Sequence, residues 1–152
     1  MGDEVLSHVD DSGKARMVDV SGKPSVRRTA VARGFISLAA ETVALVRENG
    51  IRKGDVLTVA KLAGITGAKH TALLIPLCHQ IGIEFVDVQM TLLEEGVAIE
   101  ATARCTDKTG IEMEALTAVS VAALTVYDMC KAVDKQMRIG PVELVRKTKE
   151  TV

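Results

Sequence analysis

The stretch that decides the fold runs from Thr109 to Lys135 and reads TGIEMEALTAVSVAALTVYDMCKAVDK. Its middle, AVSVAALTV, is apolar on nearly every side, which predicts a buried helix rather than a surface helix. Glu112 and Glu114 place negative charge in the first turn, where it meets the positive end of the helix macrodipole. Asp128 and Lys131 lie near the other end and are neighbours on the helix surface. These charged ends could simply reach water, or they could belong to a site.

The spacing of Glu114 and Asp128 constrains any such site. Across fourteen residues of helix they differ by about 40° around the axis, so they share a face, but they lie about 21 Å apart along it. They cannot act together on one small reacting group within a single helix. The site is therefore long, or only one end is used, or one subunit's Glu end meets another subunit's Asp–Lys end. The third alternative predicts an oligomer with its site at an interface.

The composition narrows the class of protein. The chain has 152 residues, which favours a single domain, and 47% of them are hydrophobic, enough for a core. Aromatic residues make up 2%, and the net charge is −1, so we expect no nucleic-acid partner. The sequence has no apolar run long enough to span a bilayer and no signal peptide at its polar start. Three cysteines without paired spacing favour a reducing, cytoplasmic location.

The first half of the chain is predicted to hold two strands and two helices. Residues 1–15 are expected to form a flexible arm, followed by one catalytic domain over 16–148. We expect a short strand at 15–23 and a basic strand at 26–38, with alanines on its inner face. A first helix begins after an N-cap at Ser37 and stops at Gly50. A second helix is capped by Asp55 and is weakened or broken at Gly64 and Gly67.

The second half begins with a loop that carries Cys78 and His79 after Pro76. This pair alone does not indicate a zinc site or a nucleophile, because the further ligands or partners are missing nearby. Two strands follow, joined by a turn at 94–96. After the long helix, residues 137–150 are predicted to form an edge strand, interrupted near Gly140-Pro141 and ending in a frayed tail.

With the second helix set aside, this order is β-α-β-β-α-β. That is the split pattern of an α+β ferredoxin-like sandwich, with an antiparallel sheet and one extra helix. The helices would cover one face of the sheet. The other face would be left bare, and the sheet of a second subunit could cover it.

Four segments together resemble a known family: MVDVSGK at 17–23, KGDV at 53–56, LLIPLCH at 73–79 and IEMEALTAVSVAALTVYDMCKAVDK at 111–135. The combination resembles the MoaC family, the cyclic pyranopterin monophosphate synthases of molybdenum cofactor biosynthesis. The resemblance extends from about residue 6 to residue 145. The visible departure is Gln80, which stands where the motif would have Pro.

The resemblance implies a lyase that converts (8S)-3′,8-cyclo-7,8-dihydroguanosine 5′-triphosphate to cyclic pyranopterin monophosphate and releases pyrophosphate. It implies a homohexamer built as a trimer of dimers, with sites at the interfaces. The sequence carries no cofactor motif and no recognisable metal site, so we expect no resident cofactor or metal, although Mg²⁺ could enter with the triphosphate. Matching the family's motifs to this sequence implies that Asp128, Lys131 and Lys53 are catalytic. It implies that the substrate is bound by Leu77, Cys78, His79, Glu112, Met113 and Glu114.

The chemistry of the residues agrees with that task. Because the substrate carries a triphosphate, a nearly neutral protein must gather cations locally, and Arg27 and Lys69 are further candidates for binding it. A lysine among other cations would have a lowered pKa and could exchange protons at neutral pH. The competing hypothesis is a non-catalytic ferredoxin-like sensor or oligomerisation module whose charged helix ends are merely solvated.

Overall fold

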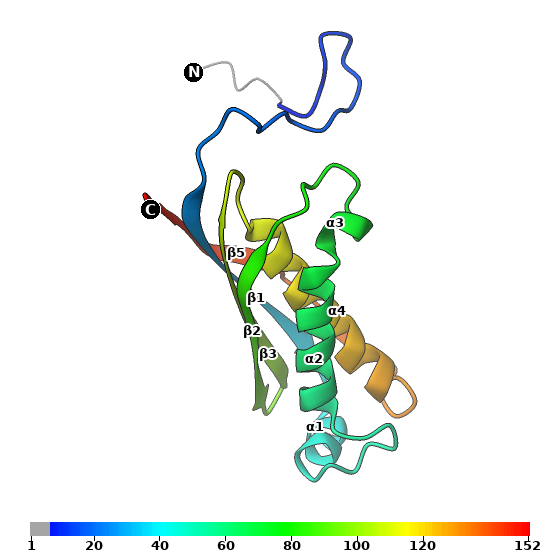
Figure 1. The fold of residues 1–152 in the computed structure, drawn as a ribbon. Coiled ribbons are helices and arrows are strands. Elements are labelled where there is room, and N and C mark those ends of the chain that lie inside the picture. The colour runs from blue at the N-terminus through cyan, green and yellow to red at the C-terminus, as the bar shows by residue number, and fades with distance from the viewer. Residues whose placement is uncertain (1–6) are drawn as a thin grey trace.

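The computed structural model describes residues 7–152; residues 1–6, part of the predicted arm, lie outside the described residues. The elements are β1 (Val26–Ser37), α1 (Ala40–Arg47), α2 (Val56–Lys69), α3 (Thr71–Leu74), β2 (Ile83–Leu93), β3 (Gly96–Asp107), α4 (Glu112–Cys130), β4 (Arg138–Ile139) and β5 (Glu143–Glu150). Five strands form one sheet, and the helices lie on one side of it (Figure 1).

The sheet has the order β2-β3-β1, with β4 and β5 both pairing with β1. Every pair is antiparallel. The chain thus forms two interleaved β-α-β units, which confirms the predicted ferredoxin-like sandwich. The helix layer consists of α2 and α4, which pack against each other, while α1 lies at one end of the sheet (Figure 1). The extra helix is therefore α1, and not the second helix as the sequence pattern indicated.

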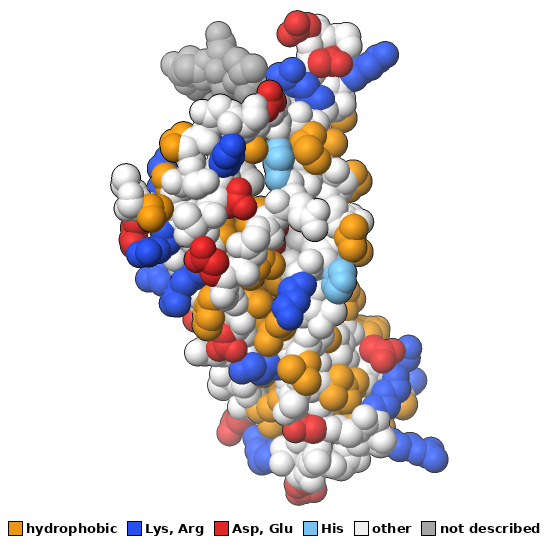
Figure 2. All heavy atoms as spheres, in the orientation of Figure 1, with side chains coloured by type: hydrophobic (Ala, Val, Ile, Leu, Met, Phe, Trp, Pro, Cys, Tyr) orange, Lys and Arg blue, Asp and Glu red, His pale blue; other side chains and the backbone are white. Residues whose placement is uncertain are grey.

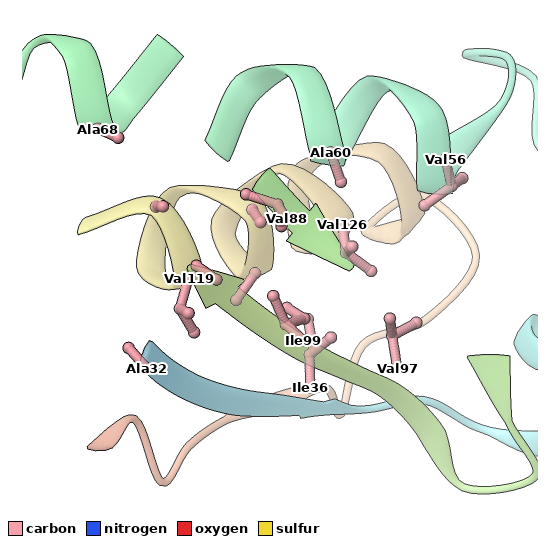
Figure 3. Close-up of a cluster of buried hydrophobic side chains, with 14 of the residues drawn as sticks. Ala32, Ile36, Val56, Ala60, Ala68, Val88, Val97, Ile99, Val119 and Val126 are labelled. Carbon is pink, nitrogen blue, oxygen red and sulfur yellow. The ribbon is translucent and has the colours of Figure 1, made fainter. Parts of the chain in front are cut away.

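Small side chains bring the two layers close together. Ala30 and Ala32 of β1 face the helices with 0% exposure, as predicted from their alternation with the arginines. Figure 3 shows Ile36 and Ile99 of the strands in one cluster with Val119 and Val126 of α4. An aliphatic core of this kind fills space with few large rings, so the backbones can approach closely.

Close approach also explains why α2 is continuous, against expectation. A Cβ at Gly64 would lie 2.8 Å from the carbonyl oxygen of Ala118, and one at Gly67 would lie 2.7 Å from a methyl of Val121. Glycine costs helix propensity at both positions. Here, packing against α4 outweighs that cost, so the prediction of a break was wrong. The predicted N-cap at Asp55 is confirmed, because its side chain accepts a hydrogen bond from the Thr58 N–H.

Two predictions for the chain before the first helix were wrong: a short strand and an N-cap. The short strand predicted at 15–23 is instead a segment outside the sheet, and an isolated bridge between Val9 and Ala15 joins its start to the residues before it. Ser37 ends β1 and does not cap α1. The first free N–H, on Ala39, instead donates 2.8 Å to Oδ2 of Asp134, a long-range contact that local sequence does not reveal.

The end of the chain also differs from expectation. Helix α4 stops at Cys130, earlier than the predicted 135, and Asp134 lies in the turn that follows. The charged tail is ordered as β5 and does not fray. Its glutamates oppose arginines of β1, and Arg33 binds Glu143 at 2.7 Å. The predicted edge position is confirmed, since β5 pairs with β1 alone.

The sheet face opposite the helices is polar and uncovered within one chain. In β1 its side chains include Arg27, Thr29 and Arg33, and β3 adds Thr102 and Arg104 by register. Helix α4 is the one helix of the described residues that is long and apolar enough to cross a membrane. However, 56% of its most apolar stretch is buried inside the protein, so α4 is a helix of the core.

Candidate active site

The start of α4 and the loop after α3 enclose a small cavity, which we call the carboxylate pocket. Its volume is about 120 Å³. Six of the eight predicted substrate-binding residues line it: Leu77, Cys78, His79, Glu112, Met113 and Glu114. Two segments more than thirty residues apart in sequence therefore meet at one place, as the motif match implied.

Glu114 is the most unusual group in this pocket. Its side chain is 3% exposed, and its Oε2 atom has no hydrogen-bond partner. Burial, helped by the negative charges of Glu112 and Asp107, raises the pKa of Glu114 to about 7. A carboxyl group with such a pKa can both give and take a proton near neutral pH.

Glu112 is the second carboxylate of the pocket. Its Oε2 atom is also buried and unpartnered, while Oε1 lies 3.5 Å from Nζ of Lys147. The side chain folds back over Gly110, where a Cβ would lie 2.8 Å from Cδ of Glu112. Gly110 therefore leaves the room that Glu112 occupies. The sequence alone does not reveal that role.

Cys78 and His79 complete the wall on the loop side. Burial raises the pKa of the Cys78 thiol, and the charges of Glu114 and Glu112 add to the effect, so the thiol stays neutral and is no activated nucleophile. The Nε2 atom of His79 is hydrogen-bonded to the carbonyl oxygen of Val18.

A larger hollow of about 490 Å³ adjoins the pocket. Cys78 and Glu114 line both, and Lys69, at the end of α2, lines the hollow together with Gln80. The structure thus brings Lys69 next to the carboxylate pocket. Gln80 is exposed at its rim, where it occupies the position of the expected Pro.

The predicted catalytic residues form a second group at the opposite end of α4, which we call the lysine cluster: Lys53, Asp128 and Lys131. Asp128 accepts from Nζ of Lys53 at 2.9 Å and from Nζ of Lys131 at 2.8 Å. The hydrogen bonds from Lys131 and Lys53 lower the pKa of Asp128 to about 2. All three side chains are about half exposed, so these ion pairs add little to stability.

One expectation for the lysine cluster is corrected. Sequence reasoning gave the site lysines a lowered pKa on account of neighbouring cations. The pKa of Lys131 is instead raised, because Asp128 hydrogen-bonds to it and attracts its charge. In this state Lys131 is a fixed cation, and it becomes a proton donor only when Asp128 is drawn away or neutralised.

Within one chain the carboxylate pocket and the lysine cluster are separated by most of α4. Glu114 and Asp128 are both in that helix, which puts them about 21 Å apart. Arg27 lies elsewhere again, on the sheet face away from the helices. It is 4.0 Å from Glu150 and lines an open hollow together with Arg104 and Arg146, two arginines that sequence analysis did not single out. The predicted site residues therefore fall into three places.

The described residues contain no group of three His, Cys, Asp or Glu side chains placed to hold a metal ion. Sequence reasoning also missed Lys108, whose Nζ donates 2.9 Å to the carbonyl oxygen of Ser21. The sequence did offer a hint of this contact, since Lys108 follows a predicted strand and Ser21 lies in the motif MVDVSGK.

Comparison with known proteins gives the family. A sequence model described as the MoaC family matches residues 17–150. The cyclic pyranopterin monophosphate synthase of Peptoclostridium acidaminophilum is 55% identical over 143 residues, covering 94% of this chain and 91% of that protein. The synthase of the same name from Heliobacterium modesticaldum is 57% identical over 145 residues, with coverage of 94% and 91%. Molybdenum cofactor biosynthesis protein 1 of Drosophila melanogaster is 57% identical over 145 residues, although this chain spans only 26% of it. The chain belongs to the MoaC family.

Proposed function

We propose that the protein is a cyclic pyranopterin monophosphate synthase of molybdenum cofactor biosynthesis. It acts on (8S)-3′,8-cyclo-7,8-dihydroguanosine 5′-triphosphate and releases pyrophosphate. Two relatives that match this chain over 91% of their own length carry that name. The structural observation that supports the proposal most is the carboxylate pocket, where six motif residues surround two buried carboxylate oxygens without partners.

The pocket suits a nitrogen-rich ring. Unpartnered carboxylate oxygens in a buried site need donors, and the N–H groups of a guanine-derived ring supply them. Glu114, with a pKa of about 7, can exchange protons with ring nitrogens while Glu112 holds the ring. This assigns substrate binding to both carboxylates and proton transfer to Glu114.

The lysine cluster suits the phosphate chemistry. In the closing step a substrate hydroxyl oxygen bonds to the α-phosphorus, the bond from that phosphorus to the bridging oxygen of the pyrophosphate breaks, and the hydroxyl proton passes to a base. Lys53 and Lys131 supply positive charge for the phosphates, and Asp128 orients both of them through its two oxygens. When phosphate displaces Asp128 from Lys131, that lysine can protonate the leaving pyrophosphate.

We infer further that the working site combines two chains. One helix keeps the two groups about 21 Å apart, too far for one compact ring and its phosphate to use both. If two subunits meet about a two-fold axis, the lysine cluster of each can lie next to the carboxylate pocket of the other. Arg27, on the open sheet face, would then reach a neighbour's phosphates. We propose a homohexamer, a trimer of dimers, with no resident cofactor and with Mg²⁺ bound, if at all, to the triphosphate.

Surface chemistry supports association. Leu62 and Leu73, on α2 and α3, are 58% and 81% exposed, and Leu124 of α4 is 59% exposed. Figure 2 shows hydrophobic side chains along the side of the molecule where α2 and α3 lie. Exposed large aliphatic side chains that gather on one side mark an interaction surface. Three cysteines without a disulfide agree with the proposed cytoplasmic location.

The direct test supplies purified protein with the cyclised guanosine triphosphate and measures pyrophosphate release together with formation of the pterin. Turnover of both products in equal amounts is expected, and Asp128→Asn should abolish most of it. Glu94→Gln is the control, because Glu94 is an exposed residue of the turn between β2 and β3 and lines neither the carboxylate pocket nor the larger hollow. Tight binding without pyrophosphate release would favour the non-catalytic sensor instead.

A further inference from the structure

The segment Met17–Lys23, which we call the strap, passes over the loop between α3 and β2 before the chain enters β1 (Figure 1). Two hydrogen bonds hold it, one to this loop and one to the segment after β3. The carbonyl oxygen of Val18 is hydrogen-bonded to Nε2 of His79, and that of Ser21 accepts from Nζ of Lys108 at 2.9 Å. Met17 also lines the larger hollow next to the carboxylate pocket. The strap is therefore part of the wall of the candidate site.

The Val18 contact decides the protonation pattern of the His79 ring. A carbonyl oxygen only accepts hydrogen bonds, so Nε2 must carry the proton. In the neutral ring Nδ1 then has the free lone pair and is the nitrogen left to accept a proton or a hydrogen bond. His70 shows the opposite arrangement, because its Nδ1 lies 2.8 Å from the carbonyl oxygen of Thr66.

A turn within the strap, formed by Asp19 and Ser21, fixes the path of its backbone. Oδ1 of Asp19 accepts from the N–H of Ser21 at 2.9 Å and from its hydroxyl at 2.7 Å, which closes a tight turn. These hydrogen bonds lower the pKa of Asp19, and the positive charge of Lys108 contributes in the same direction. The turn places the Ser21 carbonyl in reach of Lys108.

Lys108 is in turn fixed to the sheet. Its N–H donates 2.7 Å to Oδ1 of Asp107, the last residue of β3. Its carbonyl oxygen accepts from the guanidinium of Arg28 in β1 at 3.1 Å. Lys108, which holds the strap, is therefore fixed to two strands of the sheet.

We propose that Asp19 and Lys108 are positioning residues that hold the strap so that Val18 keeps the proton of His79 on Nε2 and leaves Nδ1 for the substrate. The geometry of the strap stands by itself, whereas its effect on turnover rests on the proposed synthase function. Groups that orient a histidine by binding its other nitrogen change activity by about 10- to 100-fold when removed, by analogy with metal-bound histidines.

The test uses the full chain with ¹⁵N-labelled histidine. A ring N–H appears in a proton–nitrogen correlation spectrum when a hydrogen bond protects it from exchange with water. We expect an Nε2–H signal that disappears in His79→Gln and so belongs to His79. It should be lost or strongly broadened in Asp19→Ala and in Lys108→Met. It should remain in Asp19→Asn, whose side-chain oxygen can still close the turn.

Asp10→Ala is the matched control. Asp10 forms the same kind of turn, accepting from the N–H of Ser12 at 2.9 Å and from its hydroxyl at 2.6 Å, but its hydrogen bonds within the described residues all stay inside residues 10–14. The Nε2–H signal should persist in this variant. With the cyclised substrate, kcat should fall about 10-fold or more in Asp19→Ala and Lys108→Met and stay near the wild-type value in Asp19→Asn and Asp10→Ala.

Three results would overturn the proposal: an His79 proton on Nδ1 in the wild type, an unchanged Nε2–H signal in both Asp19→Ala and Lys108→Met, or loss of the signal with unchanged kcat. A wild type that shows the expected spectra but no synthase activity would instead refute the proposed function. The spectra would still establish the hold of the strap on His79, so the two failures are distinguishable.

Discussion

Replacing Glu114 by Gln tests the electrostatics of the carboxylate pocket. The pKa of Glu114 is raised from its usual 4.5 to about 7. That difference corresponds to about 3 kcal/mol between the protonated and ionised forms in the folded state. Since Glu114 is 3% exposed, solvent screens this energy little.

The direction of the pH dependence follows from which state, folded or unfolded, binds the Glu114 proton. Between pH 4.5 and 7 the folded protein keeps the Glu114 proton and the unfolded chain releases it, so the free energy of unfolding falls as pH rises. The contribution is complete below 4.5 and lost above about 7. Gln cannot ionise, so this loss is absent in the variant. From pH 4 to pH 8 the variant should gain about 3 kcal/mol relative to the wild type.

The assay is urea unfolding at one protein concentration across this pH range. Glu94→Gln serves as the control, because Glu94 is an exposed residue of the β2–β3 turn and its replacement should leave the pH dependence unchanged. In the enzyme assay Glu114→Gln should reduce kcat by about 100-fold or more, since an amide cannot transfer protons. A stability difference between Glu114→Gln and wild type that stays constant from pH 4 to 8 would refute the reasoning.

Three further predictions concern the lysine cluster, the helix contact and the assembly. Lys53→Ala and Lys131→Ala should each abolish most pyrophosphate release with a nearly unchanged melting temperature, because both ion pairs are exposed; near-normal release by either variant would remove that lysine from the site. Gly64→Ala should destabilise the fold by about 1–3 kcal/mol in urea unfolding, since its Cβ would meet Ala118 of α4, whereas Gly82→Ala has open space and should change little. Sedimentation at micromolar concentration should show a hexamer, and a monomer alone would contradict the proposed assembly.

Much of the fold was predictable because the sheet is amphipathic in a simple way. Alternation in β1 places Ala30 and Ala32 inside, and apolar residues all round α4 place that helix in the core. The errors arose where a distant residue decides the local structure. Asp134 satisfies the start of α1, α4 fills the space beside Gly64, and the arginines of β1 order the charged tail.

The candidate site was predictable only as a set of residues. The motifs named six residues that line the carboxylate pocket and the three of the lysine cluster, but spacing along α4 could not say how the two groups meet. The raised pKa of Glu114 and the raised pKa of Lys131 depend on burial and on the Asp128 contact, respectively. Neither is visible in one sequence. The hold of Lys108 on the strap joins residues 87 positions apart.

Subunit mixing is the most direct test of the claim that the carboxylate pocket of one chain works with the lysine cluster of another. Equal amounts of Glu114→Ala and Asp128→Ala, each inactive alone, are exchanged and assayed for pyrophosphate release. In random pairs about half of the two-fold interfaces join unlike chains, and each of these restores one of its two sites. The account predicts recovery of about a quarter of wild-type activity. No recovery, with exchange of subunits demonstrated independently, would contradict it.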